Sequence, residues 1–506
     1  MVRHPNLQAL LATGADDAAA IGAPDRGALS HGALRDLAAR TIGQLNRIGI
    51  GRGDRVAIVL PNGPEMASAF IAIAAGATTA PLNPAYKTEE FDFYLGDLGA
   101  RALVVAQGWD TPARAVAAAR GVPIIELEPG ELAGDFTLHP DPALAGTAAA
   151  PGWAEADDVA LVLHTSGTTS RPKIVPLRQR NICASAAHIG GSLALTPDDV
   201  CLNIMPLFHI HGLIAAVLSS IAAGASVVCT PGFNAFRHFT WFAEVRPTWI
   251  TAVPTMHQTI LGLADRNRDV IAAGRLRLLR SSSASLPPQV MTALEETFGV
   301  PVIEAYGMTE AAHQMASNPL PPRARHPGSV GLAAGPEIAI MSPDGALRAT
   351  GELGEVVIRG PNVTAGYENN PKANAEAFTN GWFRTGDQGY LDADGYLRLT
   401  GRLKELINRG GEKVSPLEVD TVLMDHPAVA QVVTFAMPHP SLGEEVAAAV
   451  VLRPGETLSE PALREFAAAR MAGFKVPRRV VFLEEIPKGA TGKLQRIGLA
   501  EKLGLG

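Results

Sequence analysis

The stretch His164–Pro176, HTSGTTSRPKIVP, combines small and hydroxylated residues with one lysine. It follows the apolar run Val159–Leu163, which predicts a buried strand that ends at this loop. In such a loop, backbone N–H groups and Thr or Ser hydroxyls can close around phosphate oxygens, and Lys173 can supply positive charge. The alternative from this stretch alone is an ordinary turn rich in Ser, Thr and Gly. The rest of the chain favours the phosphate-binding loop.

Length and composition narrow the class of protein. A chain of 506 residues is too long for one hydrophobic core, so we expect two or more domains. Hydrophobic residues make up 47% and charged residues 18%, as in a globular protein with ample core material. The net charge of -7 offers no basic surface, so we expect no nucleic-acid partner. Cys183, Cys201 and Cys229 lack the paired spacing of metal ligands, and we interpret them as reduced core thiols.

The termini give no targeting signal. Asp16 and Asp17 interrupt the N-terminal segment before any sustained apolar run, which argues against a signal peptide. The most apolar run, Leu213–Val228, contains Ser219, Ser220 and Gly224 and is a poor candidate for a membrane span. We therefore expect a cytoplasmic protein without a membrane partner.

The first third of the chain alternates between strand-like and helix-like segments. Arg55–Leu60 and Ala102–Ala106 are predicted strands, whereas Pro64–Ala75 and Thr111–Ala119 are predicted helices. This alternation indicates a parallel sheet layered with helices, the α/β class. The segment Glu128–Ala154 is rich in Ala, Pro, Gly and Asp, and we expect a surface connection there.

After the phosphate loop the same alternation resumes. Polar or glycine-rich loops follow the ends of several predicted strands, namely PLFHIHG, PTMHQ, SSSA and YGMTEAAHQM. In an open α/β sheet, ligands bind where the carboxyl ends of the strands leave a crevice. The predicted strands here are Asp199–Met205, Ser226–Cys229, Trp249–Val253, Arg275–Arg280 and Val302–Ala305, with helices over Gly212–Ala225 and from about Ala235.

Past residue 350 the pattern changes to β structure and then to a small α+β unit. Glu355–Arg359 and Trp382–Thr400 are predicted β segments, followed by the charged, glycine-rich GRLKELINRGGEKVSP. Ser415 and Glu418 form a capping box that starts a helix at Leu417. We place the boundary between the two units near Arg402 to Lys404. The later predicted elements are strands Ala430–Phe435, Val446–Leu452 and Val480–Leu483 and a helix Glu460–Ala472.

Six motifs, in this order along the chain, carry a resemblance to a known family. They are TSGTTSRPK, PLFHIHG, YGMTE, GWFRTGD, GRLKELINRGGEKVSP and PKGATGKLQR. Together they resemble the adenylate-forming acyl-CoA synthetase (AMP-binding) family over the whole chain. The resemblance implies an N-terminal AMP/ATP- and acyl-binding domain (1–401), a hinge (402–405) and a small mobile C-terminal domain with a catalytic lysine (406–506). One departure is Ser170, where the family usually has glycine and where a positive φ is less easy for serine.

The resemblance implies an acid–CoA ligase with ATP, Mg²⁺ and coenzyme A. An acid would attack the α-phosphate of ATP, and the CoA thiol would then displace AMP. Catalysis would rest on placed cations and preorganised donors. Lys493 would carry adenylation from an exposed loop, and Lys173 would hold phosphates. The implied ATP- and AMP-binding residues are Thr165, Ser166, Gly167, Thr168, Thr169, Lys173, Ser283, Ala305, Tyr306, Gly307, Thr309, Asp387, Arg402 and Lys493.

The remaining implied roles concern the metal, the hinge and coenzyme A. Glu310 would hold Mg²⁺ through its carboxylate, a hard oxygen ligand. Lys404 would be the hinge residue about which the small domain rotates. Gly411 would leave room for pantetheine, and Lys475 is a candidate contact for the CoA nucleotide.

The acyl substrate is inferred from the polar residues near the implied reacting carboxyl. His209, His211, Ser283 and His313 are expected there, and such a lining suits a second carboxylate better than an alkyl chain. Arg280 is a further possible counter-charge, although arginines at strand ends more often lie at the surface. MPLFHIHGL and EAYGMTEAAHQM are similar to the oxalate–CoA ligase group, so oxalate is the predicted acid.

Several alternatives stay open at this point. The acid could be malonate, a medium-chain fatty acid or an aryl acid such as 4-coumarate, with the histidines structural. A luciferase-like oxygenase, a peptide-synthetase-like adenylation domain and a non-enzymatic nucleotide-binding module are other classes. The module is disfavoured by the presence of Lys173, Glu310, Asp387 and Lys493. The oligomeric state, monomer or dimer, is undetermined.

Overall fold

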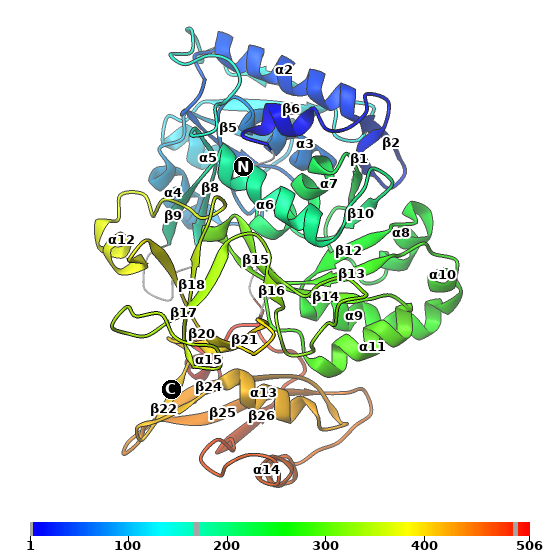
Figure 1. The fold of residues 1–506 in the computed structure, drawn as a ribbon. Coiled ribbons are helices and arrows are strands. Elements are labelled where there is room, and N and C mark those ends of the chain that lie inside the picture. The colour runs from blue at the N-terminus through cyan, green and yellow to red at the C-terminus, as the bar shows by residue number, and fades with distance from the viewer. Residues whose placement is uncertain (1–3, 166–171, 489–493) are drawn as a thin grey trace.

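The computed structural model describes residues 4–165, 172–488 and 494–506. The predicted site residues Ser166, Gly167, Thr168 and Thr169, and also Ser170 and Lys493, lie outside the described residues. The fold is mixed α/β, with a large N-terminal part and a small C-terminal part that lies at the bottom of the view in Figure 1. The predicted fold class is confirmed.

One sheet of the large part carries the strand that precedes the phosphate loop. Its inner strands are parallel, as βαβ connections require, and antiparallel strands close both edges. The strands in spatial order are β7 (Phe136–Pro140), β6 (Ile124–Pro129), β5 (Ala102–Ala106), β3 (Arg55–Val59), β4 (Thr78–Pro81), β8 (Val159–Thr165) and β9 (Lys173–Arg178).

A second sheet contains the strands whose polar ends were predicted to form the site. Parallel pairing joins β14, β13, β12, β10, β11 and β1, and an antiparallel hairpin joins β14 to β15. The strands in spatial order are β16 (Leu332–Ala333), β15 (His313–Ser317), β14 (Val302–Met308), β13 (Leu278–Ser281), β12 (Trp249–Ala252), β10 (Val200–Asn203), β11 (Ser226–Cys229), β1 (Ala19–Ala23) and β2 (Arg26–Ser30).

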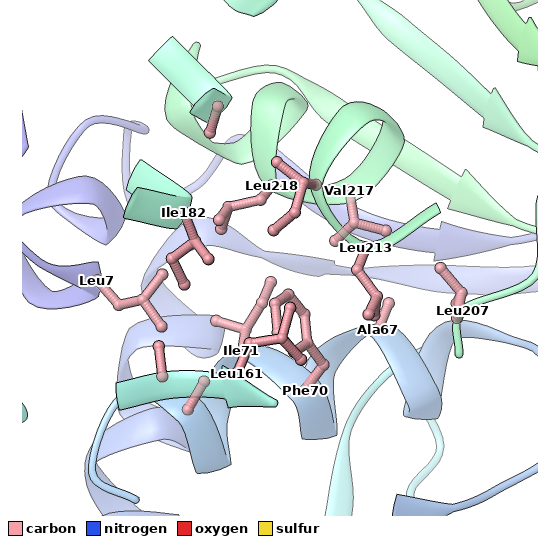
Figure 2. Packing of buried hydrophobic residues seen from close by; sticks show 14 of the residues in the cluster. Leu7, Ala67, Phe70, Ile71, Leu161, Ile182, Leu207, Leu213, Val217 and Leu218 are labelled. Atoms are coloured by element: carbon pink, nitrogen blue, oxygen red, sulfur yellow. The ribbon is translucent and has the colours of Figure 1, made fainter. Parts of the chain in front are cut away.

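The main hydrophobic core lies where helices from both sheets meet. Helix α3 (Pro64–Ala74) is apolar on nearly every face and is buried along its length, as such a helix must be. Figure 2 shows Phe70 and Ile71 of this helix in the same buried space as Leu213 and Leu218 of the π-helix η1 (His211–Leu218). Fully burying one such side chain contributes about 1.5–3 kcal/mol to stability.

The other helices of the large part cover the sheets and connect their strands (Figure 1). They are α1 (Leu7–Leu11), α2 (His31–Arg47), α4 (Thr88–Leu98), α5 (Pro112–Ala119), α6 (Gln179–Ser192), α7 (Ser219–Ala222), α8 (His238–Val245), α9 (Pro254–Ala264), η2 (Asp265–Asn267), α10 (Arg268–Ala272), α11 (Pro288–Phe298), η3 (Thr309–Ala311) and α12 (Pro371–Ala377). Within the described ranges, no helix combines the length and apolarity needed to span a membrane.

Two smaller sheets follow. The first contains the predicted Trp382–Thr400 segment as a hairpin: its strands are β17 (Glu337–Met341), β18 (Gly354–Arg359), β20 (Trp382–Leu391) and β19 (Phe378–Thr379), with β21 (Leu397–Arg402) paired to β20. The second builds the C-terminal part from β23 (Glu412–Val414), β22 (Ile407–Arg409), β25 (Gly443–Leu452) and β24 (Val429–His439), with β26 (Arg479–Phe482) paired to β25 and with helices α13 (Pro416–Met424), α14 (Glu460–Ala468) and α15 (Leu499–Lys502).

Some local predictions differ from the structure. The segment predicted as a surface connection, Glu128–Ala154, contains β7, which pairs with β6 through alternating buried residues. The predicted helix Gly212–Ala225 begins one residue earlier and is π-helical over its first two turns, a form that is rare and frequent at functional sites. Because β14 continues into its hairpin partner, it runs to Met308 instead of ending at Ala305.

Candidate active site

A cavity of about 410 Å³ opens at the carboxyl ends of β12, β13 and β14. Residues of the C-terminal part close it from the other side, among them Asp420 of α13 and Arg496. The placement agrees with the rule that ligands bind beyond the carboxyl ends of parallel strands. Six of the predicted site residues line the cavity: Ser283, Ala305, Tyr306, Gly307, Asp387 and Arg402.

The nucleotide side of this cavity is built on the β20–β21 hairpin. The strand register places Asp387 directly opposite Arg402, and Arg402 Nε lies 3.0 Å from Asp387 Oδ1. The Tyr306 hydroxyl donates a short hydrogen bond to Asp387 Oδ2. Burial, and then the neighbouring Asp387 carboxylate, hold the pKa of the Tyr306 phenol well above its ordinary value. Asp387 is buried and stays paired, so its carboxylate is held ready as a hydrogen-bond acceptor.

The phosphate side lies where the β8–β9 hairpin meets η3. Thr165 pairs with Lys173 across the two strands, at the point where the described chain stops before the loop. The Lys173 ammonium lies 4.4 Å from the centre of the Tyr367 ring, and the Tyr367 hydroxyl donates to Glu310 Oε1 over 2.8 Å. Thr309, half-buried, begins the short helix that carries Glu310. Burial raises the pKa of Glu310, and the Tyr367 hydrogen bond opposes that shift.

Tyr367 is a member of this group that the sequence analysis did not find. It joins Lys173 to Glu310 although it lies 57 residues after Glu310 in the chain. Its position in GYEN, a loop between two recognised motifs, carries no periodic or motif signal that would have selected it.

The acyl side gathers the polar residues that follow the strands of the second sheet. His211 begins the π-helix η1, and its Nδ1 lies 3.0 Å from Ser283 Oγ, a residue of the cavity wall. Its Nε2 lies 2.6 Å from Thr251 Oγ1. The rings of His211 and His313 meet edge to face at 5.0 Å. The His209 Nδ1 accepts a hydrogen bond of 3.4 Å from the backbone N–H of His211. Of the predicted acyl-site residues, Ser283 lines the cavity, whereas His209, His211 and His313 do not.

The β14–β15 hairpin joins the nucleotide side to the acyl side. Gly307 on β14 faces His313 on β15 so closely that a Cβ at Gly307 would lie 1.6 Å from the His313 carbonyl oxygen. Only glycine permits this approach. His313 itself is buried and has a φ of 102°, an uncommon conformation for any residue with a side chain.

Arg280 lies in the interior, contrary to the expectation that an arginine at this strand end is more often at the surface. Its side chain is 0% exposed, because β13 is an inner strand covered on both faces. Nη1 donates to Thr251 Oγ1 over 3.2 Å and Nη2 to Gln314 Oε1 over 3.3 Å. Burial lowers the pKa of the guanidinium to about 9. Because this value is still above 7, the group stays charged near neutral pH.

Comparisons with known proteins show the family to which the chain belongs. Residues 7–368 match the model of the AMP-binding enzyme family, and residues 418–493 match that of the AMP-binding enzyme C-terminal domain. The chain belongs to the AMP-binding enzyme family. It is 46% identical over 488 residues to an oxalate–CoA ligase of Arabidopsis thaliana (94% of this chain, 95% of that one). It is 42% identical over 475 residues to one of Saccharomyces cerevisiae (89% and 87%).

Solved structures of related enzymes have the same fold. The crystal structure of ATP-bound MatB from Rhodopseudomonas palustris superposes with a TM-score of 0.88 at 31% identity and covers 99% of both chains. The protein is therefore an acid–CoA ligase of the AMP-binding family, and ATP and CoA are the substrates that fit this family.

In this AMP-binding enzyme, Arg402 and Glu405 of the predicted hinge segment line the cavity, whereas Lys404 and the residues predicted for coenzyme A do not. Lys404 is exposed between β21 and β22, and Gly411, with a φ of 96°, forms the exposed turn between β22 and β23. Lys475 Nζ lies 2.6 Å from Glu418 Oε1. By contrast Leu494, which follows Lys493 in the chain, lines the cavity. The roles of these residues stay predictions.

The cysteines and the potential metal ligands of the described residues form no further site. Cys183, Cys201 and Cys229 are buried free thiols, and burial raises the pKa of each. They are therefore core residues and not nucleophiles. Among the described residues, no cluster of three His, Cys, Asp or Glu side chains forms a metal site.

Proposed function

We propose that this protein is an oxalate–CoA ligase, which converts oxalate, ATP and CoA into oxalyl-CoA, AMP and pyrophosphate. The observation that carries the proposal is a group of polar side chains at the cavity wall: Ser283 lines the cavity, His211 contacts both Ser283 and His313 behind it, and Thr251 joins His211 to the buried Arg280. Oxalate has no methylene between its carboxylates, so the groups that meet the second charge must lie within one side-chain length of the first. The relatives named as oxalate–CoA ligases, which span nearly the whole chain, support the same acid.

The first half-reaction would join the acid to AMP. One oxalate oxygen attacks the α-phosphorus, the bond to the bridging oxygen of the β-phosphate breaks, and pyrophosphate leaves with that electron pair. Asp387 would accept hydrogen bonds from the ribose hydroxyls, with Arg402 fixing its orientation. Lys173 and Thr165 would hold the leaving phosphates, and Lys493 would contact the oxalate oxygen and the α-phosphate as charge shifts between them.

Magnesium fits the phosphate side. Glu310 is a buried carboxylate whose pKa is raised by burial, and a divalent cation beside it would restore its charged form. Mg²⁺ takes one or two protein carboxylates and completes its shell with phosphate oxygens and water, so a single Glu310 suffices. The ion would neutralise charge on the β- and γ-phosphates.

The second half-reaction would form the thioester. The CoA sulfur attacks the carbonyl carbon of the adenylate, and the bond to AMP breaks with the electron pair leaving on AMP. We propose that rotation about Lys404, within the hinge 402–405, brings Gly411 to the cavity, where its lack of a side chain leaves room for pantetheine. Lys475 would then contact the CoA nucleotide. Buried free thiols suit a reducing compartment, which supports a cytoplasmic enzyme.

The test is pyrophosphate release with ATP, Mg²⁺ and CoA across oxalate, malonate, acetate, octanoate and 4-coumarate. A site built to bind a second carboxylate should reject acids that lack it by about 10⁴-fold in kcat/KM. Oxalate should lead. A higher rate with malonate, octanoate or 4-coumarate would mean that this acid, and not oxalate, is the substrate. The acid–CoA ligase activity itself would be unaffected by that result.

A further inference from the structure

A continuous chain of hydrogen bonds runs from the interior to the cavity wall. It starts at Arg280 Nη1, which donates to Thr251 Oγ1, and the same Thr251 oxygen lies 2.6 Å from His211 Nε2. His211 Nδ1 then lies 3.0 Å from the Oγ of Ser283, which faces the cavity. Strand pairing sets the first step, because Thr251 of β12 is the register partner of Arg280 of β13. Arg280, Thr251 and His211 are all 0% exposed.

The chemistry of each group fixes the direction of this chain. A guanidinium has only donors, so Thr251 Oγ1 must accept from Arg280. In the described structure Thr251 has one other side-chain partner, His211 Nε2, and its hydroxyl hydrogen is buried. A buried hydroxyl hydrogen without an acceptor is costly, so Thr251 donates to Nε2. His211 is then the neutral tautomer with its hydrogen on Nδ1, and it donates to Ser283 Oγ.

The hydrogen bond between His211 and Ser283 decides whether the Ser283 hydroxyl presents a donor or an acceptor to the cavity. Since Ser283 Oγ accepts from His211, its own hydrogen is free to turn toward the cavity, where it can donate to a carboxylate. With the opposite tautomer Ser283 would donate to His211 and present only lone pairs to the cavity, which repel an anion. Arg280 takes part in none of the ion pairs found among the described residues, so its charge also favours an anion above it.

We propose that Arg280 and Thr251 are positioning residues that hold His211 as the Nδ1–H tautomer and thereby make the Ser283 hydroxyl a donor to the acid substrate. This inference rests on the proposed function, because it places the acid carboxylate at Ser283. It assigns two residues that do not touch substrate to the selection of an anionic acid.

The kinetic test uses a matched pair at Thr251. Thr251→Val keeps the shape of the side chain and removes the hydroxyl, whereas Thr251→Ser keeps the hydroxyl. We expect Thr251→Val to raise the KM for oxalate about tenfold or more, the effect of one misdirected hydrogen bond, with the KM for ATP unchanged. Thr251→Ser should stay close to the parent enzyme. Equal changes in both KM values, or equal losses in both variants, would show a packing role and overturn the proposal.

A spectroscopic test does not depend on activity. Histidine-selective ¹⁵N NMR of the full chain distinguishes a protonated from an unprotonated ring nitrogen, and the loss of signals in His211→Gln assigns the residue. The parent protein should show His211 protonated at Nδ1, and Thr251→Val should shift that signal toward mixed tautomers. His211 protonated at Nε2 in the parent would overturn the inference. If oxalate is not the substrate but His211 is protonated at Nδ1, the proposed substrate is wrong, whereas the hydrogen-bond chain from Arg280 to Ser283 is supported.

Discussion

The nucleotide side and the acyl side of the cavity are held together in different ways. On the nucleotide side, Asp387 forms an ion pair with Arg402, and on the adjoining phosphate side Tyr367 donates to Glu310 and lies beside Lys173. On the acyl side, hydrogen bonds link Ser283 to His211, His211 to Thr251, and Thr251 to a guanidinium, that of Arg280, which has no ion pair among the described residues. A site for ATP needs hydrogen-bond acceptors for the ribose and cations for the phosphates, both held in fixed positions. A site for a small anion needs hydrogen-bond donors and a positive charge that is not already paired with a carboxylate.

The largest effect is expected at Lys493, the residue proposed to contact both the acid and the α-phosphate. On that proposal, Lys493→Ala should lower the rate of adenylate formation on the order of 10³-fold, because it would remove a positive charge that stabilises the transition state. Thioester formation from supplied oxalyl-adenylate should be nearly unchanged. Single-turnover assays of the two half-reactions measure this, and Lys488→Ala, which alters an exposed lysine paired with Glu485, is the control. An equal loss in both half-reactions would contradict the assigned role.

A change confined to the nucleotide side should leave the acid untouched. Asp387→Asn removes the charge that is paired with Arg402 and that we propose accepts hydrogen bonds from the ribose hydroxyls, so the KM for ATP should rise about 10- to 100-fold. The KM for oxalate should not change. Steady-state kinetics with each substrate varied in turn checks this, with the exposed Asp394→Asn as the matched control. A parallel rise in both KM values would mean that the two sides do not act separately.

The converse change belongs to the acyl side. His313→Ala removes the ring that packs against His211 and should raise the KM for oxalate about tenfold, with a smaller change for ATP. His139→Ala, an exposed histidine on β7, serves as the control. Thermal unfolding of the variant must show a folded protein before the kinetics are compared. Unchanged oxalate kinetics in a folded variant would make His313 a structural residue.

The smallest effect concerns a buried acid that belongs to neither side. Glu304 lines the cavity but is almost fully buried, and burial raises its pKa from 4.5 to about 8. The native state therefore keeps a proton on Glu304 that the unfolded state loses above pH 4.5, so this group lowers stability as pH rises from about 5 to 8. Glu304→Gln should flatten that decline in Tm without altering either KM. Thermal unfolding at pH 5, 6, 7 and 8 tests it, and an unaltered slope would contradict it.

Much of the nucleotide side could be predicted because its residues lie within short motifs. RTGD and GRLKE place Asp387 and Arg402 on adjacent strands, and YGMTE contains Tyr306 and Glu310. The chain of hydrogen bonds from Arg280 to Ser283 could not be predicted in the same way. Thr251 lies in WITAV, which has the composition of a buried strand, and its contact with Arg280 depends on the pairing of two strands. Periodicity locates strands along the chain but does not give the register between distant ones.

Other misses have local physical causes. The strands β1 and β2 lie in a segment whose small residues weaken the periodic signal. The long helix α2, by contrast, buries Leu34, Leu37, Ala38 and Leu45 at helical spacing, so its pattern in the sequence could have predicted it. In the π-helix at His211, Gly212 packs so closely against the preceding loop that a Cβ there would lie 2.4 Å from the Pro206 carbonyl oxygen. Intrinsic helix propensity contains no information about that contact.

The close approach of Gly307 to His313 has a consequence for redesign of this enzyme. Because these residues share one hairpin and Gly307 leaves no room beside the His313 backbone, a substitution at His313 that shifts this backbone would also shift the strand that carries Tyr306. Libraries for new acids should therefore vary the β12–β13 side, at Thr251 and Arg280 together. We expect variation there to change which acid is accepted, while the hairpin that carries Tyr306 keeps its shape.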